Sequence, residues 1–127
     1  MSDPEALKRK TLFVAVREGL VLGSVAVATF FPAFWKSKYW AEPKAAALGV
    51  FDLVVFPDLQ GQGVGKFLMD GVEELAHDRG FSYVRLDAFA QNPSSNGFYR
   101  RIGYVDRGEI EVRTCRLQLY EKCVRPV

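Results

Sequence analysis

Short apolar runs separated by polar or glycine-containing stretches dominate the first half of the chain, and their lengths predict strands. Residues 12–16 and 20–31 are two such runs, and Arg17-Glu18-Gly19 lies between them. Strand-forming runs joined by a short glycine-containing turn are typical of a β-hairpin. A third run, residues 47–56, predicts another strand, and Asp52 is the only charge inside it.

The second half of the chain alternates between strand and helix patterns. Apolar residues recur at helical spacing over 65–79, and Gly80 then supplies a stop. A strand is predicted over 81–89, with Val84, Leu86 and Ala88 on one face and Tyr83, Arg85 and Asp87 on the other. A short helix ending at Gly103 and two strands, 104–113 and 115–123, complete the pattern. This alternation predicts an α/β fold, a sheet with helices packed on its faces.

The 127 residues suit a single domain, 1–127, because no internal repeat or linker divides them. We predict a lead-in over 1–11 and a core over 12–123. The segment from Phe30 to Pro43 forms a loop with six aromatic residues: Phe30, Phe31, Phe34, Trp35, Tyr39 and Trp40. Such a loop is either a lid over a pocket or a packed cover on one sheet face, and the sequence leaves both open.

Charge and composition exclude several classes of function. The net charge of +2 argues against a nucleic-acid partner, which requires concentrated positive charge. Two cysteines make no disulfide framework and no Cys/His spacing suggests zinc, so we expect no metal and a reducing cytoplasm. The apolar run from Leu20 to Phe34 is interrupted and too short to span a bilayer, and the polar start is not a signal peptide.

The junction between the third strand and the long helix carries the clearest chemical signal. Gly61, Gly63 and Gly65 lie within five residues, so backbone N–H groups there can turn toward one point without obstruction by Cβ atoms. The helix start adds unpaired N–H groups and a partial positive charge. Together these predict an anion site, most plausibly for phosphate. The alternative is a glycine-rich turn that binds nothing.

Two well-known phosphate loops do not fit this junction. A P-loop requires a glycine five residues before its Gly-Lys pair and Ser or Thr after it, whereas Gln60 and Phe67 occupy those positions. The glycine spacing also differs from Gly-x-Gly-x-x-Gly. The remaining pattern, Gln60-x-x-Gly63-x-Gly65, resembles the acyl-CoA pyrophosphate loop of the GNAT superfamily of N-acyltransferases.

A second stretch strengthens this resemblance. Asn92-Pro93-Ser94-Ser95-Asn96-Gly97-Phe98-Tyr99 and the following residues to Tyr104 are similar to the superfamily's Asn-x-x-Ala/Ser-x-x-Phe/Leu-Tyr-x-x-x-Gly-Phe/Tyr signature. The two motifs occur in the family's order, and the resemblance covers residues 12–123. It implies a mixed, mostly antiparallel sheet flanked by helices. It also implies an N-terminally shortened version, because ten lead-in residues cannot supply the usual first strand and two helices that help to form the acceptor site.

The resemblance also implies roles for individual residues. The backbone of Leu53, Val54 and Val55 would pair with the pantetheine arm of the cofactor. The pyrophosphate would lie on the N–H groups of Gly61, Gln62, Gly63, Val64, Gly65 and Lys66, beside Gln60, where the family often has arginine. Asn92 and Ser95 would contact the cofactor, although helix capping explains both equally well.

Two further residues are candidates for the chemistry. Tyr99 would lie near the thioester sulfur and protonate the departing thiolate, or else be a core aromatic. Asp52 would accept the proton of the amine or attract a cationic substrate, or else be an ordinary surface carboxylate.

The resulting hypothesis is an acetyl-CoA-dependent N-acetyltransferase that acts on an amine of a small molecule or peptide. The alternative is a catalytically inactive acyl-CoA-binding sensor or subunit, which a shortened acceptor half would favour. We also expect a homodimer, with the hairpin and the aromatic loop in the interface, because an uncovered sheet edge and apolar surface are usually paired. The competing arrangement is a monomer in which residues 1–10 fold back over that edge.

Overall fold

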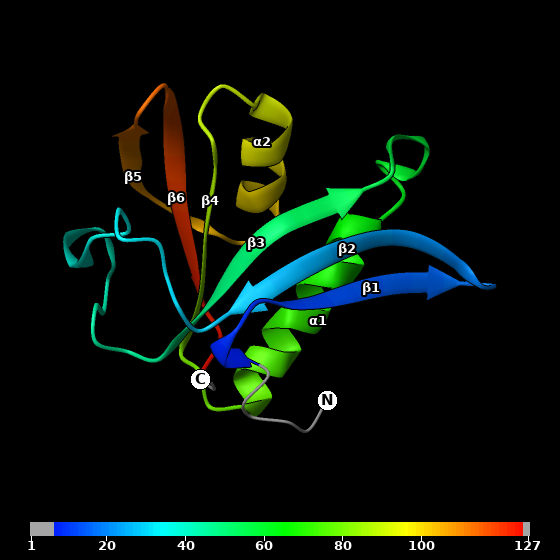
Figure 1. Ribbon diagram of the computed structural model, residues 1–127, viewed down its shortest axis with the longest axis horizontal. Coiled ribbons are helices and arrows are strands. Elements are labelled where there is room, and N and C mark those ends of the chain that lie inside the picture. The colour runs from blue at the N-terminus through cyan, green and yellow to red at the C-terminus, as the bar shows by residue number, and fades with distance from the viewer. Residues whose placement is uncertain (1–6, 126–127) are drawn as a thin grey trace.

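The computed structural model describes residues 7–125, which form a sheet of six strands with two α-helices (Figure 1). In chain order the elements are β1 (Thr11–Arg17), β2 (Leu20–Ala28), η2 (Ser37–Tyr39), β3 (Ala47–Val55), η3 (Pro57–Leu59), α1 (Val64–Asp78), β4 (Tyr83–Phe89), α2 (Pro93–Arg101), β5 (Val105–Val112) and β6 (Cys115–Cys123). Each predicted strand and helix is therefore present. Residues 1–6 of the predicted lead-in lie outside the described residues.

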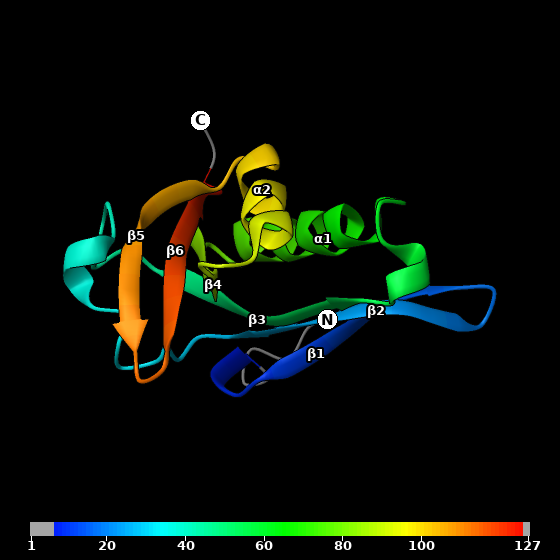
Figure 2. The same ribbon diagram turned by 90° about the horizontal axis from the view of Figure 1, so that it is seen from above.

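The strand order is β1-β2-β3-β4-β6-β5. Only β3 and β4 run parallel, and α1 provides the crossover between them. The other four neighbouring pairs are antiparallel. This arrangement confirms the predicted mixed, mostly antiparallel sheet. Figure 2 shows α1 and α2 on the same side of β1, β2 and β3.

The second strand is shorter than its apolar run predicts. β2 ends at Ala28, not at Phe31. The next residue, Thr29, donates both its backbone N–H and its hydroxyl to the carbonyl of Leu7, at 2.7 and 2.9 Å. Leu7 itself is buried. The described end of the lead-in therefore packs at the end of the hairpin and turns the chain away from the sheet.

The main core lies between α1 and the sheet. Leu68, Met69, Val72 and Ala76 of α1 are buried in one cluster with apolar residues of the strands. Burying a side chain such as that of Met69 contributes about 1.5–3 kcal/mol. Gly23 on β2 is required for close packing, because a Cβ there would lie 2.6 Å from the carbonyl oxygen of Val54.

The aromatic loop is a packed cover. It lies beside β5 and β6 in both views of the ribbon (Figures 1 and 2). Trp35 and Trp40 are each 7% exposed and form a second core with residues of β5 and β6. The expectation that a monomer cannot bury this loop, which placed it in a dimer interface, is therefore wrong for its two tryptophans. Phe30 and Phe31 remain exposed.

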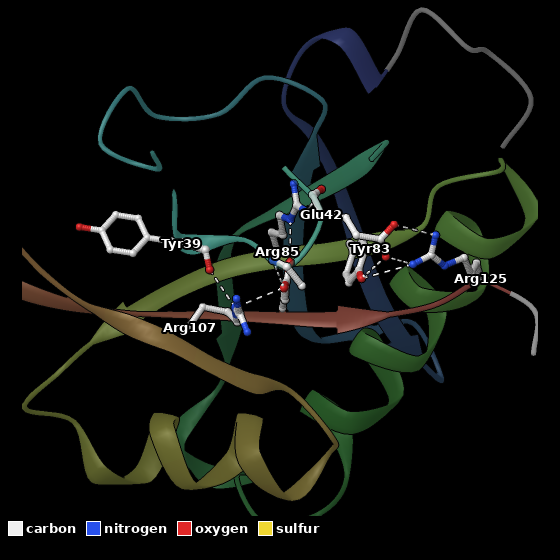
Figure 3. Close-up of polar contacts among 8 residues, drawn as sticks. Tyr39, Glu42, Tyr83, Arg85, Arg107 and Arg125 are labelled. Atoms are coloured by element: carbon white, nitrogen blue, oxygen red, sulfur yellow. Dashed lines mark hydrogen bonds and ion pairs between the residues drawn. The ribbon is translucent and has the colours of Figure 1, made fainter. Parts of the chain in front are cut away.

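A buried ionic network fixes the far end of this loop to the sheet (Figure 3). The guanidinium Nε of Arg85 on β4 donates to Glu121 on β6 at 3.0 Å, and both side chains are buried. Glu121 also accepts the backbone N–H of Ala41 at 2.9 Å. Arg107 on β5 donates to the carbonyl of Tyr39 at 2.8 Å. The loop backbone is thus held by charged groups from three strands.

Candidate active site

The parallel strands β3 and β4 separate part-way along their length, and we call this point the fork (Figure 1). Their register runs through three pairs and stops at Gly49 and Arg85. Beyond it, Asp52 adopts a left-handed backbone conformation with φ of 53°, and the pairing of β2 with β3 shifts register. A bulge of this kind bends a strand, so β3 turns away from β4. The backbone of Leu53, Val54 and Val55 then lies along the open side.

At the end of β3 the chain forms the predicted glycine-rich turn and enters α1. Gly61 and Gly63 have φ of 82° and 86°, which L side chains rarely adopt, and a Cβ on either would meet no atom within 4 Å. The first helical hydrogen bond runs from Phe67 N–H to the Gly63 carbonyl at 2.9 Å. The N–H groups of residues 64–66 therefore precede it and point out of the helix end. Open space, free donors and the positive helix end make a suitable cradle for an anion.

The other predicted residues of this turn have defined contacts. Gln60 donates its side-chain amide to the carbonyl of Val55 at 3.3 Å, and Gln62 donates to that of Asp58 at 3.2 Å. Gly65 serves close packing, because a Cβ there would lie 3.2 Å from the Phe98 ring of α2. The two glutamines thus brace the loop, and Gly65 brings the start of α1 against α2.

Lys66, in the first turn of α1, contributes a side chain as well as a backbone donor. Its ammonium pairs with Asp70 at 2.9 Å on the exposed helix surface. The hydrogen bond and charge of Asp70 raise the pKa of Lys66. The side chain therefore remains cationic at neutral pH.

The start of α2 is held by two asparagines. The side-chain oxygen of Asn92 accepts the N–H of Ser95 at 3.1 Å, so Asn92 caps the helix. Asn96, which sequence reasoning did not single out, is buried and donates to the carbonyl of Phe89 at 2.9 Å. It also accepts the hydroxyl of Tyr120 at 2.5 Å. These bonds fix α2 over β4 and β6 and so set the position of Tyr99.

Tyr99 has a buried ring and an accessible hydroxyl. The residue is 7% exposed, and its ring packs against those of Phe98, Tyr104 and Tyr120 at centroid distances of 5.2, 5.8 and 5.9 Å. Every fully buried side-chain oxygen or nitrogen within residues 7–125 has a hydrogen-bond partner. The hydroxyl of Tyr99 makes none of the hydrogen bonds found there, so it reaches open space. Burial raises the pKa of Tyr99 to about 12, and the charge of Asp87 adds to the shift.

Asp87 on β4 is the residue that sequence reasoning missed. It is half-buried, two residues beyond Arg85, where the pairing of β4 with β3 stops, and accepts the indole N–H of Trp35 at 2.8 Å. Burial raises the pKa of this carboxyl; the Trp35 hydrogen bond opposes the shift, and the nearby charge of Asp52 adds to it. A carboxylate inside an otherwise buried strand was the signal that could have identified it.

Asp52 occupies the bulge on the opposite strand of the fork. Its side chain is 71% exposed and lies 3.5 Å from the ammonium of Lys10. The neighbouring Phe51 ring stacks on Trp35 with the centroids 5.6 Å apart. The fork therefore brings together the predicted Asp52, the unpredicted Asp87 and the stacked rings of Phe51 and Trp35. Tyr99 is close enough for the charge of Asp87 to raise its pKa.

Comparison with known proteins agrees with this geometry. A family model described as Acetyltransferase (GNAT) family matches residues 2–104. The chain belongs to the GNAT acetyltransferase family. The resemblance seen in the two sequence motifs is thereby confirmed.

Several relatives show how far the likeness of this GNAT chain extends. It is 34% identical over 64 residues to the thialysine N-epsilon-acetyltransferase of Bos taurus, a match that covers 50% of this chain and 38% of that protein. The ribosomal-protein-S18-alanine N-acetyltransferase of Escherichia coli superimposes with a TM-score of 0.73 at 16% identity, covering 94% of this chain and 72% of that one. A Salmonella typhimurium protein described as an acetyltransferase with its cofactor acetyl-CoA gives 0.72 at 17% identity, covering 97% and 69%. The two structures show the shared fold.

Two kinds of feature are absent from the described part of this GNAT chain. No cluster of three or more His, Cys, Asp or Glu side chains among residues 7–125 has a metal-binding arrangement. Over the same range, none of the helices has the length and apolar character needed to cross a membrane.

Proposed function

We propose that this chain is an acetyl-CoA-dependent N-acetyltransferase that acetylates an amine of a small molecule or peptide. The observation that carries this proposal is the fork, because the elements that border it carry the glycine-rich turn, the phenol of Tyr99 and the half-buried carboxylate of Asp87. Family membership supports the reaction class. The acetyl-CoA of the Salmonella typhimurium protein supports the choice of cofactor.

The residues around the fork fit acetyl-CoA. The N–H groups of Gly61, Gly63, Val64, Gly65 and Lys66 would hold the pyrophosphate, and the open space above Gly61 and Gly63 leaves room for it. The N–H of Gln62 already donates to the carbonyl of Leu59 at 3.3 Å. On its side away from β2, the backbone of residues 53–55 would pair with the pantetheine arm as an added strand does. We assign the side-chain amide of Asn92 and the hydroxyl of Ser95 to further cofactor contacts. Gln60 would adjoin the phosphates without adding a charge.

When bound, acetyl-CoA supplies the thioester carbonyl carbon that the amine attacks. Asp87 accepts the proton that the amine loses, and its raised pKa brings its basicity closer to the working pH of an enzyme. The hydroxyl of Tyr99 donates a hydrogen bond to the leaving sulfur. Asp52, exposed at the mouth of the fork, attracts a cationic acceptor.

Calorimetry with acetyl-CoA, combined with a thiol-release assay on a panel of primary amines, tests the function. We expect binding, and release of thiol with at least one amine. Asp87→Asn should retain binding and lose turnover. If acetyl-CoA binds but no amine in the panel releases thiol, the transferase proposal fails and the acyl-CoA sensor takes its place.

The homodimer remains our proposal for assembly, now with the hairpin alone in the interface. Phe13 and Ala15 of β1 pack into the core, whereas the alternating Leu12, Val14 and Val16 face outward and are 63, 50 and 55% exposed. β1 is also an edge strand, and such edges are usually paired or covered. Light scattering should give a dimer mass at micromolar concentration, and Val14→Lys should reduce it. A monomer mass for the unmodified chain would exclude the dimer.

We place the protein in the cytoplasm. Cys115 and Cys123 are both free thiols, which suits a reducing compartment. Cys123 is exposed, so an oxidising environment would leave it open to modification. Fractionation of the source cells with detection by antibody tests this location.

A further inference from the structure

The chain carries an amine of its own beside β3, one of the two strands that border the fork. The ammonium of Lys10 lies 3.5 Å from the carboxylate of Asp52 and 5.1 Å from the centre of the Phe51 ring. Both partners belong to β3, immediately beyond Gly49, where its pairing with β4 stops. A carboxylate and an aromatic face are the two groups that bind a primary ammonium best.

A continuous set of contacts leads from this ammonium to the proposed base. Phe51 stacks on Trp35 at 5.6 Å between ring centroids, and Trp35 donates its indole N–H to Asp87 at 2.8 Å. The charge of Asp52 also reaches Asp87 directly, since it contributes to the raised pKa of that carboxyl. The nitrogen of Lys10 is therefore connected through Phe51 and Trp35 to the carboxylate that would remove a proton from an acceptor.

The side chain of Lys10 can move from this resting position. Its pair with Asp52 is exposed on both partners, with 49% and 71% of the side chains accessible. Exposed ion pairs contribute little to stability, so the ammonium can leave this position easily. Four rotatable carbon–carbon bonds then allow the nitrogen to swing toward Asp87.

We propose that Lys10 is acetylated by its own chain. This inference rests on the proposed function. After Lys10 leaves Asp52, its ammonium releases one proton to water. The neutral Nζ then forms a bond to the acetyl carbonyl carbon, and the carbon–sulfur bond of the acetyl-CoA thioester breaks. The proton lost by Nζ passes to Asp87, the leaving thiolate takes up a proton, and coenzyme A departs as a thiol. Lys10 becomes a neutral amide.

Acetylation of Lys10 removes its contacts with Asp52 and Phe51. A neutral amide no longer forms the ion pair with Asp52 or the cation–π contact with Phe51. Both groups then become available to the ammonium of an incoming acceptor. The reaction occurs once per chain, because the acetylated lysine is not released. It leaves Asp52 and Phe51, which Lys10 contacted before, free to bind an acceptor.

Peptide mass spectrometry of the full chain after incubation with deuterated acetyl-CoA tests the proposal. Lys44 is a matched control, because it is also an exposed lysine. We expect Lys10 to be acetylated at least about tenfold faster than Lys44, as expected for a nucleophile held near the reacting carbon. The rate at Lys10 should not depend on protein concentration, and Asp87→Asn should slow Lys10 without affecting Lys44. Equal rates at the two lysines, or a Lys10 rate that rises with protein concentration, would overturn the proposal.

A second measurement needs no cofactor. In cofactor-free protein, the Nζ resonance of Lys10 should shift on Asp52→Asn, while that of Lys44 stays unchanged. If the Lys10 resonance does not shift on Asp52→Asn, Lys10 does not lie beside Asp52 and the proposal fails.

The amine panel separates this proposal from the proposed function. Turnover of a small amine with Lys10 left unmodified would overturn self-acetylation and leave the transferase intact. Thiol release from no amine, with Lys10 also unmodified, would overturn both.

Discussion

Replacing Tyr99 with phenylalanine removes one hydroxyl from the fork and leaves the ring in place. The ring packs against three other aromatic side chains, so Tyr99→Phe should keep the fold and the melting temperature. The hydroxyl itself reaches open space and forms none of the hydrogen bonds found within residues 7–125. Any change in turnover therefore reports on its role in the reaction.

The raised pKa sets the size of the expected effect. A phenol with a pKa of about 12 is a poor donor of a whole proton to a thiolate of pKa about 8.5. A hydrogen bond to the developing charge is the contribution that remains, and bonds to charged groups contribute about 1.5–3 kcal/mol. At about 1.4 kcal/mol per factor of ten, Tyr99→Phe should lower kcat by about tenfold to 150-fold. Acetyl-CoA affinity should be nearly unchanged.

The assay is thiol release under saturating amine, with cofactor affinity measured by calorimetry. Tyr104→Phe is the matched control, because Tyr104 contacts the Tyr99 ring but donates its own hydroxyl to Glu73 at 3.0 Å. That control should keep its turnover. The unmodified enzyme should also show no loss of kcat/KM between about pH 8 and pH 10, since a phenol of pKa about 12 keeps its proton there. A loss below tenfold for Tyr99→Phe, or an equal loss for Tyr104→Phe, would refute the reasoning and leave a packing role.

Four other predictions concern the proposed base, the glycine-rich turn and the buried ion pair. Asp87→Asn should lower kcat by about 10²–10⁴-fold, as measured by thiol release. The variant should stay folded in a melting curve, because the amide oxygen still accepts the Trp35 N–H. Since burial raises the pKa of Asp87, the acidic limb of kcat/KM should lie above the ordinary aspartate range and vanish in this variant. Gly63→Glu should abolish acetyl-CoA binding in calorimetry, whereas Gly71→Ala, where a Cβ also meets no atom within 4 Å, should not; unchanged affinity for Gly63→Glu would move the pyrophosphate elsewhere. Glu121→Ala should destabilise the fold by about 3–5 kcal/mol in urea denaturation, because it leaves a buried guanidinium unpaired; a loss below about 1 kcal/mol would mean that water reaches the pair.

The elements of the fold could be predicted because their signals are local. The apolar period of α1, the glycines before it and the capping pattern of Asn92 all lie within a few residues of what they determine. The early end of β2 could not be predicted, since it depends on a hydrogen bond from Thr29 to Leu7, 22 residues earlier. A contact between segments so far apart leaves no periodic trace in either one.

In the candidate site, too, local features could be predicted and long-range contacts could not. The glycine-rich turn before α1 could be predicted, because its glycines and N–H groups belong to consecutive residues; its role in binding the cofactor stays a prediction. The environment of Asp87 could not, because it is made by Trp35, 52 residues away in sequence. An aspartate in a strand shows its charge in the sequence but not its burial, and it is burial that raises its pKa.

The carboxylate of Asp87 accepts the Trp35 hydrogen bond and is also the proposed base. As a base, Asp87 must gain a proton in every catalytic cycle, and a neutral carboxyl accepts a weaker hydrogen bond than a carboxylate does. Under the proposed function, each turnover would weaken the hydrogen bond from Trp35 and restore it when the proton is lost to water. The other end of the loop is held by Arg85 and Glu121, whose ion pair does not depend on Asp87. The proton cycle of the reaction would therefore be transmitted to the Trp35 end of the aromatic loop alone.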